Sequence, residues 1–397
     1  MKYRILLALL SLLCVPPASA QVYSITNLGN FSPTAINSWG QVVGNRNGEA
    51  FVWAQFTGLK GLGKLPGGSA SYAASINDLG VVTGTADGAG TVISQDPIDY
   101  PNLNCSDLTQ PFVWIPGKGM KGLGTVGVPP YETNAPFWCG FPFYATGIND
   151  IGQVTGYTIP YEDNYQWAFL WTSANGWKGA APLFGSSFPP NVANGIANSG
   201  QIVGQTGIFL GQATSWKNGV ATDLGTLNDG IDLDYSSSAN AINQQGQVVG
   251  WSTTESLISS CDADLVGCPM HAALWTRSGV ISDLGTLPGD ELSMATNINF
   301  FGQVIGNSGN TLAEQGWGGN GGSGFEGNGG SVAVIGRAFV WSQCNGMQDL
   351  NTLIPSGSGW VLNSVSGINN WGQIVGTGTV NGQTRGFLLT PRGFQCL

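Results

Sequence analysis

Few residues in this sequence have the chemistry that catalysis requires. His271 is the only histidine, so a Ser-His-Asp or Cys-His arrangement would have to use it. Neither H-E-x-x-H nor G-x-S-x-G occurs. The position of His271, directly before an apolar strand, is occupied elsewhere in the chain by Glu49, Gln110, Trp167, Gln212, Arg337 and Arg385. A position that accepts all these side chains is expected to lie on the surface. We identify no catalytic residue, and the sequence favours a non-enzyme while leaving catalysis open.

One acidic segment has the oxygen ligands that a hard cation prefers. The stretch "NDGIDLD" places Asp229, Asp232 and Asp234 close together with a glycine. Alternating carboxylates of this kind can surround calcium, although their order does not match an EF-hand loop. The alternatives are a calcium site and a solvated acidic loop, and no other cofactor is indicated.

A second candidate site is a segment dense in aromatic residues. The stretch "VPPYETNAPFWCGFPFY" contains Tyr131, Phe137, Trp138, Phe141, Phe143 and Tyr144. Aromatic faces on exposed loops stack on sugar rings or contact apolar partners. The segment therefore predicts a binding site for a glycan or an extracellular protein. The alternative is a small local core that anchors a long loop.

The first twenty residues read as a secretory signal peptide. Lys2 and Arg4 precede an apolar run from Ile5 to Val15, and the stretch "ASA" at positions 18–20 is typical of a cleavage site. We expect residues 21–397 to form a single secreted or periplasmic domain. No later stretch is long and apolar enough to be a membrane span.

The cysteines agree with export. The chain after residue 20 contains Cys105, Cys139, Cys261, Cys268, Cys344 and Cys396. An even number in an exported protein predicts disulfides. Their places in the repeats described below favour the pairs 105–139, 261–268 and 344–396. Free buried thiols are the alternative.

The charge balance limits the partners. The chain has 13 Lys and Arg against 23 Asp and Glu, a net charge of -10, and charged residues make up only 9% of it. Loss of Lys2 and Arg4 with the signal peptide would take this to -12. So acidic a chain has no overall footprint for nucleic acid or for an anionic membrane surface.

One phrase recurs seven times and dominates the architecture. It reads "AINSWGQVVGN", "SINDLGVVTGT", "GINDIGQVTGY", "GIANSGQIVGQ", "AINQQGQVVGW", "NINFFGQVIGN" and "GINNWGQIVGT". Asn at the first position and Gly at the fourth predict a type I turn followed by a left-handed glycine, hence two strands and their connection. Two copies depart from the pattern, because Ala197 replaces the Asn and Val81 replaces the Gln.

Two further phrases complete each unit. An apolar strand ending in Trp ("AFVW", "AFLW") is followed by "DLGTL" or a variant of it. We name the four expected strands A (ending in IN), B (GQVVG), C (AFLW) and D (DLGTL). Seven such units predict an all-β fold, a seven-bladed β-propeller of four-stranded antiparallel blades, with a β-solenoid as the alternative. Apolar pairs such as Val42 and Val43 should then face neighbouring blades on opposite sides.

These repeats resemble the HAF extracellular repeat of bacterial exported proteins. The resemblance covers essentially the whole chain after the signal peptide. Of the His-Ala-Phe triplet, only His271-Ala272 keeps the His, and Ala273 stands in place of the Phe. The family implies export from a bacterium, and it implies no established chemistry or catalytic residues.

Insertions between the strands point to one face of the predicted disc. B–C and D–A links should emerge on one face, and A–B and C–D turns on the other. The long links are Thr85 to Gln110, Tyr157 to Trp167, Trp251 to His271, Asn307 to Arg337 and Thr125 to Thr146, all on the first face. We expect a binding protein that uses this insertion face for a glycan or protein partner. A polysaccharide hydrolase or lyase with paired carboxylates and a structural surface protein are the alternatives. The oligomeric state is not indicated.

The two ends of the chain are expected to meet. The segment from Tyr23 to Leu28 aligns with strand D, and Gly393 to Leu397 aligns with the start of the same strand. One blade should therefore contain both ends and close the ring.

Overall fold

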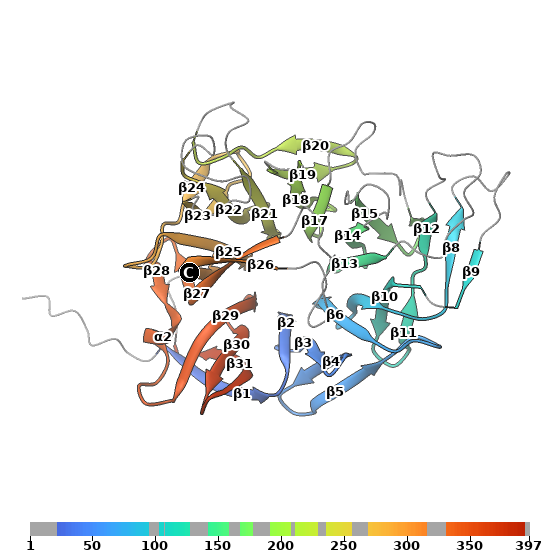
Figure 1. Cartoon of the computed structure of the whole chain (residues 1–397), viewed down its shortest axis with the longest axis horizontal. Coiled ribbons are helices and arrows are strands. Elements are labelled where there is room, and N and C mark those ends of the chain that lie inside the picture. The colour runs from blue at the N-terminus through green and yellow to red at the C-terminus, as the bar shows by residue number, and fades with distance from the viewer. Residues whose placement is uncertain are drawn as a thin grey trace, which may run out of the picture.

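The structure is a computed structural model of the chain. It describes residues 22–94, 103–106, 108–127, 142–158, 167–177, 191–207, 211–228, 236–255, 269–315 and 331–393. Regular structure in these ranges is almost entirely β-strand. Seven four-stranded antiparallel sheets surround a central axis, and the predicted seven-bladed β-propeller is confirmed (Figure 1).

Every blade has the predicted order, with strand A nearest the axis and strand D outermost (Figure 1). The first four blades are blade 1, β2 (Ser32–Ile36), β3 (Val42–Arg46), β4 (Glu49–Ala54) and β5 (Gly58–Gly63); blade 2, β6 (Ser71–Ile76), β7 (Val82–Ala86), β10 (Gln110–Ile115) and β11 (Gly119–Gly122); blade 3, β13 (Phe143–Ile148), β14 (Val154–Thr158), β15 (Trp167–Thr172) and β16 (Gly176–Trp177); and blade 4, β17 (Asn191–Ile196), β18 (Ile202–Thr206), β19 (Gln212–Lys217) and β20 (Val220–Asp223). The other three are blade 5, β21 (Ser237–Ile242), β22 (Val248–Thr253), β23 (Met270–Trp275) and β24 (Ile281–Asp283); blade 6, β25 (Leu292–Ile298), β26 (Val304–Gln315), β27 (Ser331–Ser342) and β28 (Gly346–Asp349); and blade 7, β29 (Trp360–Ile368), β30 (Ile374–Val380), β31 (Gln383–Pro391) and β1 (Tyr23–Gly29).

Blade 7 is built from both ends of the chain. Strand β1 pairs antiparallel with β31, with Tyr23 opposite Pro391 and Asn27 opposite Phe387. The N-terminal strand therefore supplies strand D of the last blade, and the predicted closure of the ring is confirmed. On the C-terminal side β31 ends at Pro391, and residues 394–397 lie outside the described residues.

The core lies between the blades. Val42 packs with Val375 and Leu388 of blade 7, whereas Val43 packs with Ala73 and residues of blade 2. Both valines are fully buried. Since burying a valine contributes about 1.5–3 kcal/mol, each apolar pair holds a blade to both neighbours.

The phrase "DLGTL" lies at the exit of strand D, which corrects its prediction as the strand itself. β24 ends at Asp283, whose carboxylate accepts a hydrogen bond from Gly285 N at 2.7 Å. Leu284 and Leu287 then enter the core between blades 5 and 6. The phrase thus combines a turn with two buried leucines.

Two insertions contain structure that the repeats did not predict. Next to blade 2, β8 (Gly90–Ser94), β9 (Leu103–Cys105) and β12 (Thr125–Gly127) form a separate sheet, in which β8 and β12 are parallel. In blade 6, β26 and β27 continue as a pair of twelve-residue strands, so much of the predicted B–C link is a strand extension. A single turn of helix, α2 (Leu350–Leu353), follows β28.

The two faces of the disc carry different connections. The A–B and C–D turns share one face, which we call the turn face. The strand ends that flank the five insertions lie on the opposite face, which we call the insertion face. No described helix has the length and apolar character needed to cross a membrane.

Candidate functional site

The turn face begins with the asparagine of the repeated phrase. In blade 1, Asn37 Oδ1 accepts hydrogen bonds from Trp39 N at 3.1 Å and Gln41 N at 3.0 Å. Its Nδ2 donates to Gln41 Oε1 at 2.8 Å. Gly40 closes the turn with a φ of 72°, a left-handed conformation that a side chain would strain. The paired Asn and Gln of the phrase are therefore one hydrogen-bonded unit.

The same amide also joins each blade to the next. Asn37 Nδ2 donates to the carbonyl of Asn77 at 3.1 Å, and the equivalent bond recurs around the axis. The donors are Asn37, Asn77, Asn149, Asn243, Asn299 and Asn369, all buried. With Ala197 at the seventh position, these residues form what we call the inner ring.

Blade 4 is the exception. Ala197 has no amide to donate to blade 5, and Gln201, without its partner, donates instead to Ser215 Oγ at 2.7 Å. The turn still forms, because Gly200 N donates to Ala197 O at 2.9 Å. The asparagine is therefore needed for the junction between blades more than for the turn.

A second circle of bonds lies deeper in the ring. Every strand A has a bulge, shown by a register shift, two residues before the isoleucine of the repeated phrase. In blade 1 the bulged residue Thr34 donates from Oγ1 to the carbonyl of Ala73 at 3.1 Å. We call the bulged residues the bulge ring: Thr34, Ala74, Thr146, Asn194, Asn240, Thr296 and Ser366. All except Ala74 donate to the next blade.

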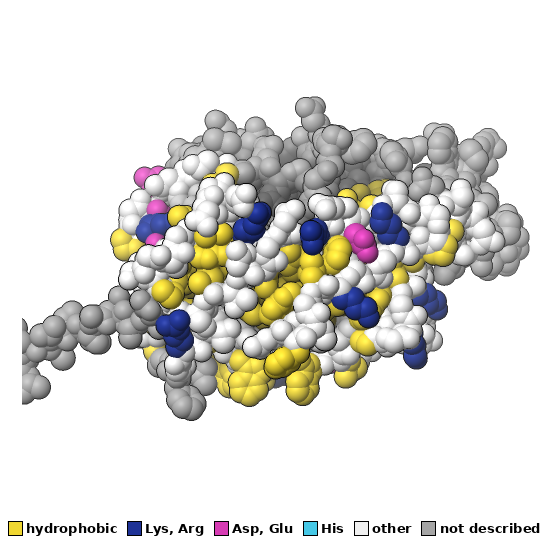
Figure 2. Space-filling view, turned by 90° about the horizontal axis from the view of Figure 1, so that it is seen from below, with side chains coloured by type: hydrophobic (Ala, Val, Ile, Leu, Met, Phe, Trp, Pro, Cys, Tyr) yellow, Lys and Arg dark blue, Asp and Glu magenta, His cyan; other side chains and the backbone are white. Residues whose placement is uncertain are grey.

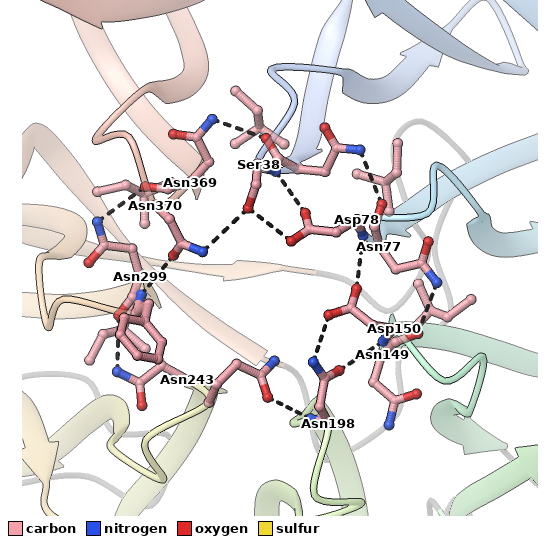
Figure 3. Close-up of a pocket in the computed structure, with 18 of the residues that line it drawn as sticks. Ser38, Asn77, Asp78, Asn149, Asp150, Asn198, Asn243, Asn299, Asn369 and Asn370 are labelled. Atoms are coloured by element: carbon pink, nitrogen blue, oxygen red, sulfur yellow. Dashed lines mark hydrogen bonds between the residues drawn. The ribbon is translucent and has the colours of Figure 1, made fainter.

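Above the inner ring, the residues that follow each asparagine meet around a central depression (Figure 3). Ser38 N donates to Asp78 Oδ1 at 2.8 Å, and Asp78 N donates to Asp150 Oδ1 at 2.9 Å. Asn198 Nδ2 donates to Asp150 Oδ2 at 2.6 Å. Both carboxylates are therefore acceptors within the ring, so their geometry is that of structural links.

The depression itself is small. Its volume is about 170 Å³, and its lining is mainly asparagine amides, backbone and isoleucine. Sites for drug-sized ligands are typically about 300–1,000 Å³. In the described part of the chain, the turn face is consequently better suited to contact with a surface than to enclosure of a small molecule.

Apolar side chains surround this depression. Of the eleven large hydrophobic residues that are exposed in the described ranges, nine lie in or beside A–B or C–D turns: Trp39, Phe56, Leu79, Ile151, Val220, Val280, Phe300, Phe301 and Trp371. We call these nine the turn tips. Every blade contributes at least one. Seen edge-on, hydrophobic side chains protrude along the lower edge of the disc (Figure 2).

The two tryptophans are held in fixed orientations. Trp39 is 77% exposed and its Nε1 donates to the carbonyl of Asp78 at 2.8 Å. Trp371 is 73% exposed and its Nε1 donates to the carbonyl of Ser38 at 2.9 Å. Because each indole N–H already has an acceptor, both rings can be covered by an apolar partner without leaving a donor unpaired.

The predicted aromatic site is largely untested. Tyr131, Phe137, Trp138 and Phe141 lie outside the described residues. Phe143 is buried in β13, with its ring centre 5.2 Å from that of Trp177, so its predicted role in stacking on a ligand is wrong.

Tyr144, the last member of the aromatic site, is half-buried against Tyr157. Burial and the neighbouring Tyr144 raise the pKa of Tyr157 above its usual value. The two rings pack against each other within blade 3, on paired positions of β13 and β14.

The predicted calcium ligands Asp229, Asp232 and Asp234 also lie outside the described residues. Within the described ranges, no group of three or more His, Cys, Asp or Glu residues could hold a metal ion. The calcium site stays a prediction.

The described residues include only two of the six cysteines that are predicted to pair. Cys105 and Cys344 are each disulfide-bonded. The other four cysteines, Cys139, Cys261, Cys268 and Cys396, lie outside the described residues, so the three pairings stay predictions.

His271 has a structural partner. Its Nδ1 lies 2.8 Å from Asp283 Oδ2, joining strands C and D of blade 5, and the side chain is only a quarter exposed. Burial alone would raise the pKa of Asp283, but hydrogen bonds from His271 and from Gly285 N outweigh it and lower the pKa. The position is therefore a cross-strand link, not the plain surface position that the sequence predicted.

The equivalent residue of blade 6 makes a similar link. Arg337 Nη2 lies 2.8 Å from Asp290 Oδ2, and Arg337 Nη1 lies 3.2 Å from Asp349 Oδ2. Burial would lower the pKa of Arg337, but the two carboxylates raise it. One guanidinium thus pairs with both carboxylates and offsets one of their two negative charges.

Comparisons with known proteins add little. No protein-family model matches the chain, and no curated protein matches it. A solved structure described as "Structure of Dos1 propeller" is similar over 91% of this chain and 78% of that chain, at 9% sequence identity and a TM-score of 0.38. A likeness this low carries no argument about the site.

Proposed function

We propose that this chain is an exported, non-enzymatic binding protein that contacts a macromolecular surface through its turn face. One observation carries the proposal: nine of the eleven exposed large hydrophobic residues in the described ranges share that face. Exposed large apolar side chains that gather on one face mark interaction sites. The nine turn tips are largely exposed, so burial between the blades does not explain their gathering on one face.

The rigidity of the face supports binding. The inner ring and the bulge ring connect neighbouring blades through buried amides and hydroxyls, each bond contributing about 0.5–1.5 kcal/mol. The turn tips project directly from this frame. Side chains that are already fixed lose little conformational entropy when a partner covers them.

Binding is favoured over catalysis by the state of the two carboxylates on this face. Asp78 and Asp150 both accept backbone hydrogen bonds from a neighbouring blade. A pair of carboxylates acting as acid and base would have to be available to substrate. On the turn face the pair is already committed to holding the ring together.

Export is the second part of the proposal. It is supported by the sequence of residues 1–20 and by the resemblance of the seven repeats to HAF proteins of bacteria. The insertion face, with its predicted glycan or protein site at Tyr131 to Phe141, is the competing location for binding.

The test compares the two faces in one assay. Wild-type protein lacking residues 1–20 is incubated with isolated cell-envelope fragments and, separately, with a panel of immobilised polysaccharides, while product formation is followed. We expect the double variant Trp39→Ser, Trp371→Ser to lose envelope binding, and a deletion of residues 128–142 to keep it. Thermal unfolding checks that both variants fold. Release of sugar products, or loss of binding only in the deletion, would overturn the proposal.

A further inference from the structure

The turn tips are distributed around the whole circle of the disc. Blades 6, 7, 1, 2 and 3 carry apolar A–B tips, and blades 1, 4 and 5 carry apolar residues at their C–D turns. A partner that touched one side of the disc would need only a few adjacent blades. Apolar tips on all seven blades fit an occupant that is itself broad and flat.

Charge separates the candidates for such an occupant. The A–B and C–D turns with their flanking strand residues contain three basic residues, Lys118, Lys217 and Arg277, against two acidic ones, Asp78 and Asp150. Arg392, directly after the end of β31 in blade 7, adds a fourth exposed basic residue to this face. All four basic side chains are exposed, whereas both carboxylates are half-buried acceptors in the ring. The exposed charge of the turn face is therefore positive, opposite in sign to the chain's net charge of -10.

The insertion face has the reverse balance. Its described connections and flanking strand ends contain four basic residues against eight acidic ones: Arg46, Lys64, Arg337 and Arg385, and Glu49, Asp87, Asp223, Glu255, Asp283, Asp290, Glu291 and Asp349. Near a negatively charged surface, a molecule with this charge distribution orients its turn face toward the surface. The acidic composition argues against anionic partners for the chain as a whole. Its uneven distribution between the faces nevertheless orients the molecule, with the turn face toward an anionic surface.

We propose that the turn face docks on an anionic lipid surface. This rests on the proposed function and names the class of its partner. The nine turn tips enter the boundary between headgroups and acyl chains, and Lys118, Lys217 and Arg277 face anionic headgroups. Trp39 and Trp371 suit that boundary, because their rings are apolar while their N–H groups are already bonded. A second copy of the chain would also offer a broad, flat surface. Two turn faces in contact would repel each other, however, because both carry exposed positive charge.

The test is co-sedimentation with lipid vesicles. The protein lacking residues 1–20 is mixed with vesicles of phosphatidylcholine alone, or of two parts phosphatidylcholine to one part phosphatidylglycerol. We expect binding to the mixed vesicles, weakened by added salt. The double variant Trp39→Ser, Trp371→Ser should lower the partition coefficient by about tenfold, since aromatic side chains dominate such contacts. The triple variant Lys118→Gln, Lys217→Gln, Arg277→Gln should weaken the preference for phosphatidylglycerol.

Val361 provides the matched control. It is one of the two exposed large hydrophobic residues outside the turn face in the described ranges, and its exposure is 55%. It lies near the insertion-face end of β29. Val361→Ser removes exposed apolar surface, in a smaller amount, from the insertion face, so it should leave vesicle binding unchanged. If it lowers binding as much as the tryptophan variant does, the turn face is not the docking surface.

The remaining outcomes separate the lipid proposal from the function on which it rests. If wild-type protein ignores both vesicles but its tryptophan variant still loses envelope binding, the partner is a protein or glycan and only the lipid proposal is overturned. If sedimentation velocity shows a dimer that the tryptophan variant abolishes, and vesicles do not bind, the occupant is a second copy. If neither envelope nor vesicle binding responds to the tryptophans, both proposals fail.

Discussion

Two junctions of the ring, between blades 7 and 1 and between blades 4 and 5, share one backbone arrangement but differ in their bonds. At the first, Asn369 Nδ2 donates to the carbonyl of Asn37 at 3.0 Å. Ser366 Oγ donates to a blade 1 carbonyl at 2.8 Å, and Trp371 Nε1 donates to Ser38 O at 2.9 Å. The inner ring, the bulge ring and a turn tip all cross this junction.

The junction between blades 4 and 5 lacks the inner-ring link. Ala197 leaves the inner ring open there, so of the inner ring and the bulge ring only Asn194 Nδ2 crosses the junction, bonded at 2.9 Å to a blade 5 carbonyl. Asn198 N adds a bond to Gln244 Oε1 at 2.8 Å on the exposed side. The tips of the two A–B turns are Ser199 and Gln245, and neither is apolar.

The difference shows that the inner-ring bond and the apolar tips are both missing at the same junction. The junction crossed by both rings lies beneath the two exposed tryptophans, and the junction without an inner-ring bond lies beneath polar tips. A docking surface gains from a rigid support, because a support that moves would spread the apolar contacts over many geometries. Variants that equalise the two junctions test how far each feature depends on the buried amides.

The largest effect is expected from Asn369→Ala, which gives the first junction the inner-ring residue that blade 4 has naturally. Asn369 is buried and makes four hydrogen bonds: Oδ1 accepts from Trp371 N and Gln373 N, and Nδ2 donates to Gln373 Oε1 and Asn37 O. Loss of these bonds, with buried groups left unpaired, should lower the free energy of unfolding by about 3 kcal/mol. Urea unfolding measures it.

The control for Asn369→Ala is Asn175→Ala, at an exposed turn position of blade 3. Its cost should stay within about 0.5 kcal/mol, as for other surface substitutions. A loss of less than about 1 kcal/mol in Asn369→Ala would mean that the inner ring does not hold the blades together.

A smaller effect of opposite sign is expected from Ala197→Asn, which completes the inner ring. The new amide should donate to the carbonyl of Asn243, as the other six asparagines donate to their neighbours. Gln201 must leave Ser215 to pair with it, which removes part of the gain. We expect stabilisation of about 1 kcal/mol, again by urea unfolding.

Ala197→Ser separates the two roles of the position. A serine hydroxyl can accept from the turn amides but is too short to reach blade 5. If the serine variant gains as much as the asparagine variant, the benefit lies within the turn and the junction is not involved.

The sequence predicted the blades because packing between blades acts on every copy. Val42 and Val43, buried against different neighbours, produce the paired apolar positions that identified the fold. The left-handed glycines were predicted for the same reason, and Gly40 and Gly246 have φ values of 72° and 81°. Features that repeat seven times are visible without a structure.

The candidate site was not predicted, and the reason is physical. Nothing in the sequence indicates that Trp39 and Trp371 are exposed, since a turn phrase does not show whether its third residue points into solvent. The bulge ring had a signal in the small polar residues two positions before the isoleucine, such as Thr34 and Thr146. These residues bond to the next blade because a register shift places them in a bulge, and that shift is seen only in the paired strands.

A still smaller gain is expected from Ala74→Thr, which completes the bulge ring in blade 2. By analogy with Thr34 and Thr146, the new hydroxyl should donate to the carbonyl of Ala145. We expect stabilisation of about 0.5 kcal/mol, at the low end for a hydrogen bond because a side-chain rotamer must also be fixed. Ala74→Val has the same shape without the hydroxyl, so equal stability of the two variants would assign the effect to packing.

The smallest effect is expected on acidification. The prediction compares how acid weakens the outer strands of blades 5 and 7. In blade 5, His271 and Gly285 N hold the pKa of Asp283 below its usual value against the opposing effect of burial. A lowered folded-state pKa stabilises the protein above the unfolded value of about 3.9. That contribution is lost as the pH falls through the folded value. The effect should be modest, because 45% of the Asp283 side chain is exposed and solvent screens the pair.

Strand pairing in blade 7 has no such group, because β1 and β31 contain no carboxylate. Acidification from about pH 5 to about pH 3 should therefore lower the amide-exchange protection of β24 more than that of β1, after correction for the intrinsic exchange rate. The variant Asp283→Asn should abolish this difference. Equal loss of protection in both strands would show that acid weakens the ring as a whole, and that the cross-strand pair of blade 5 has no separate role.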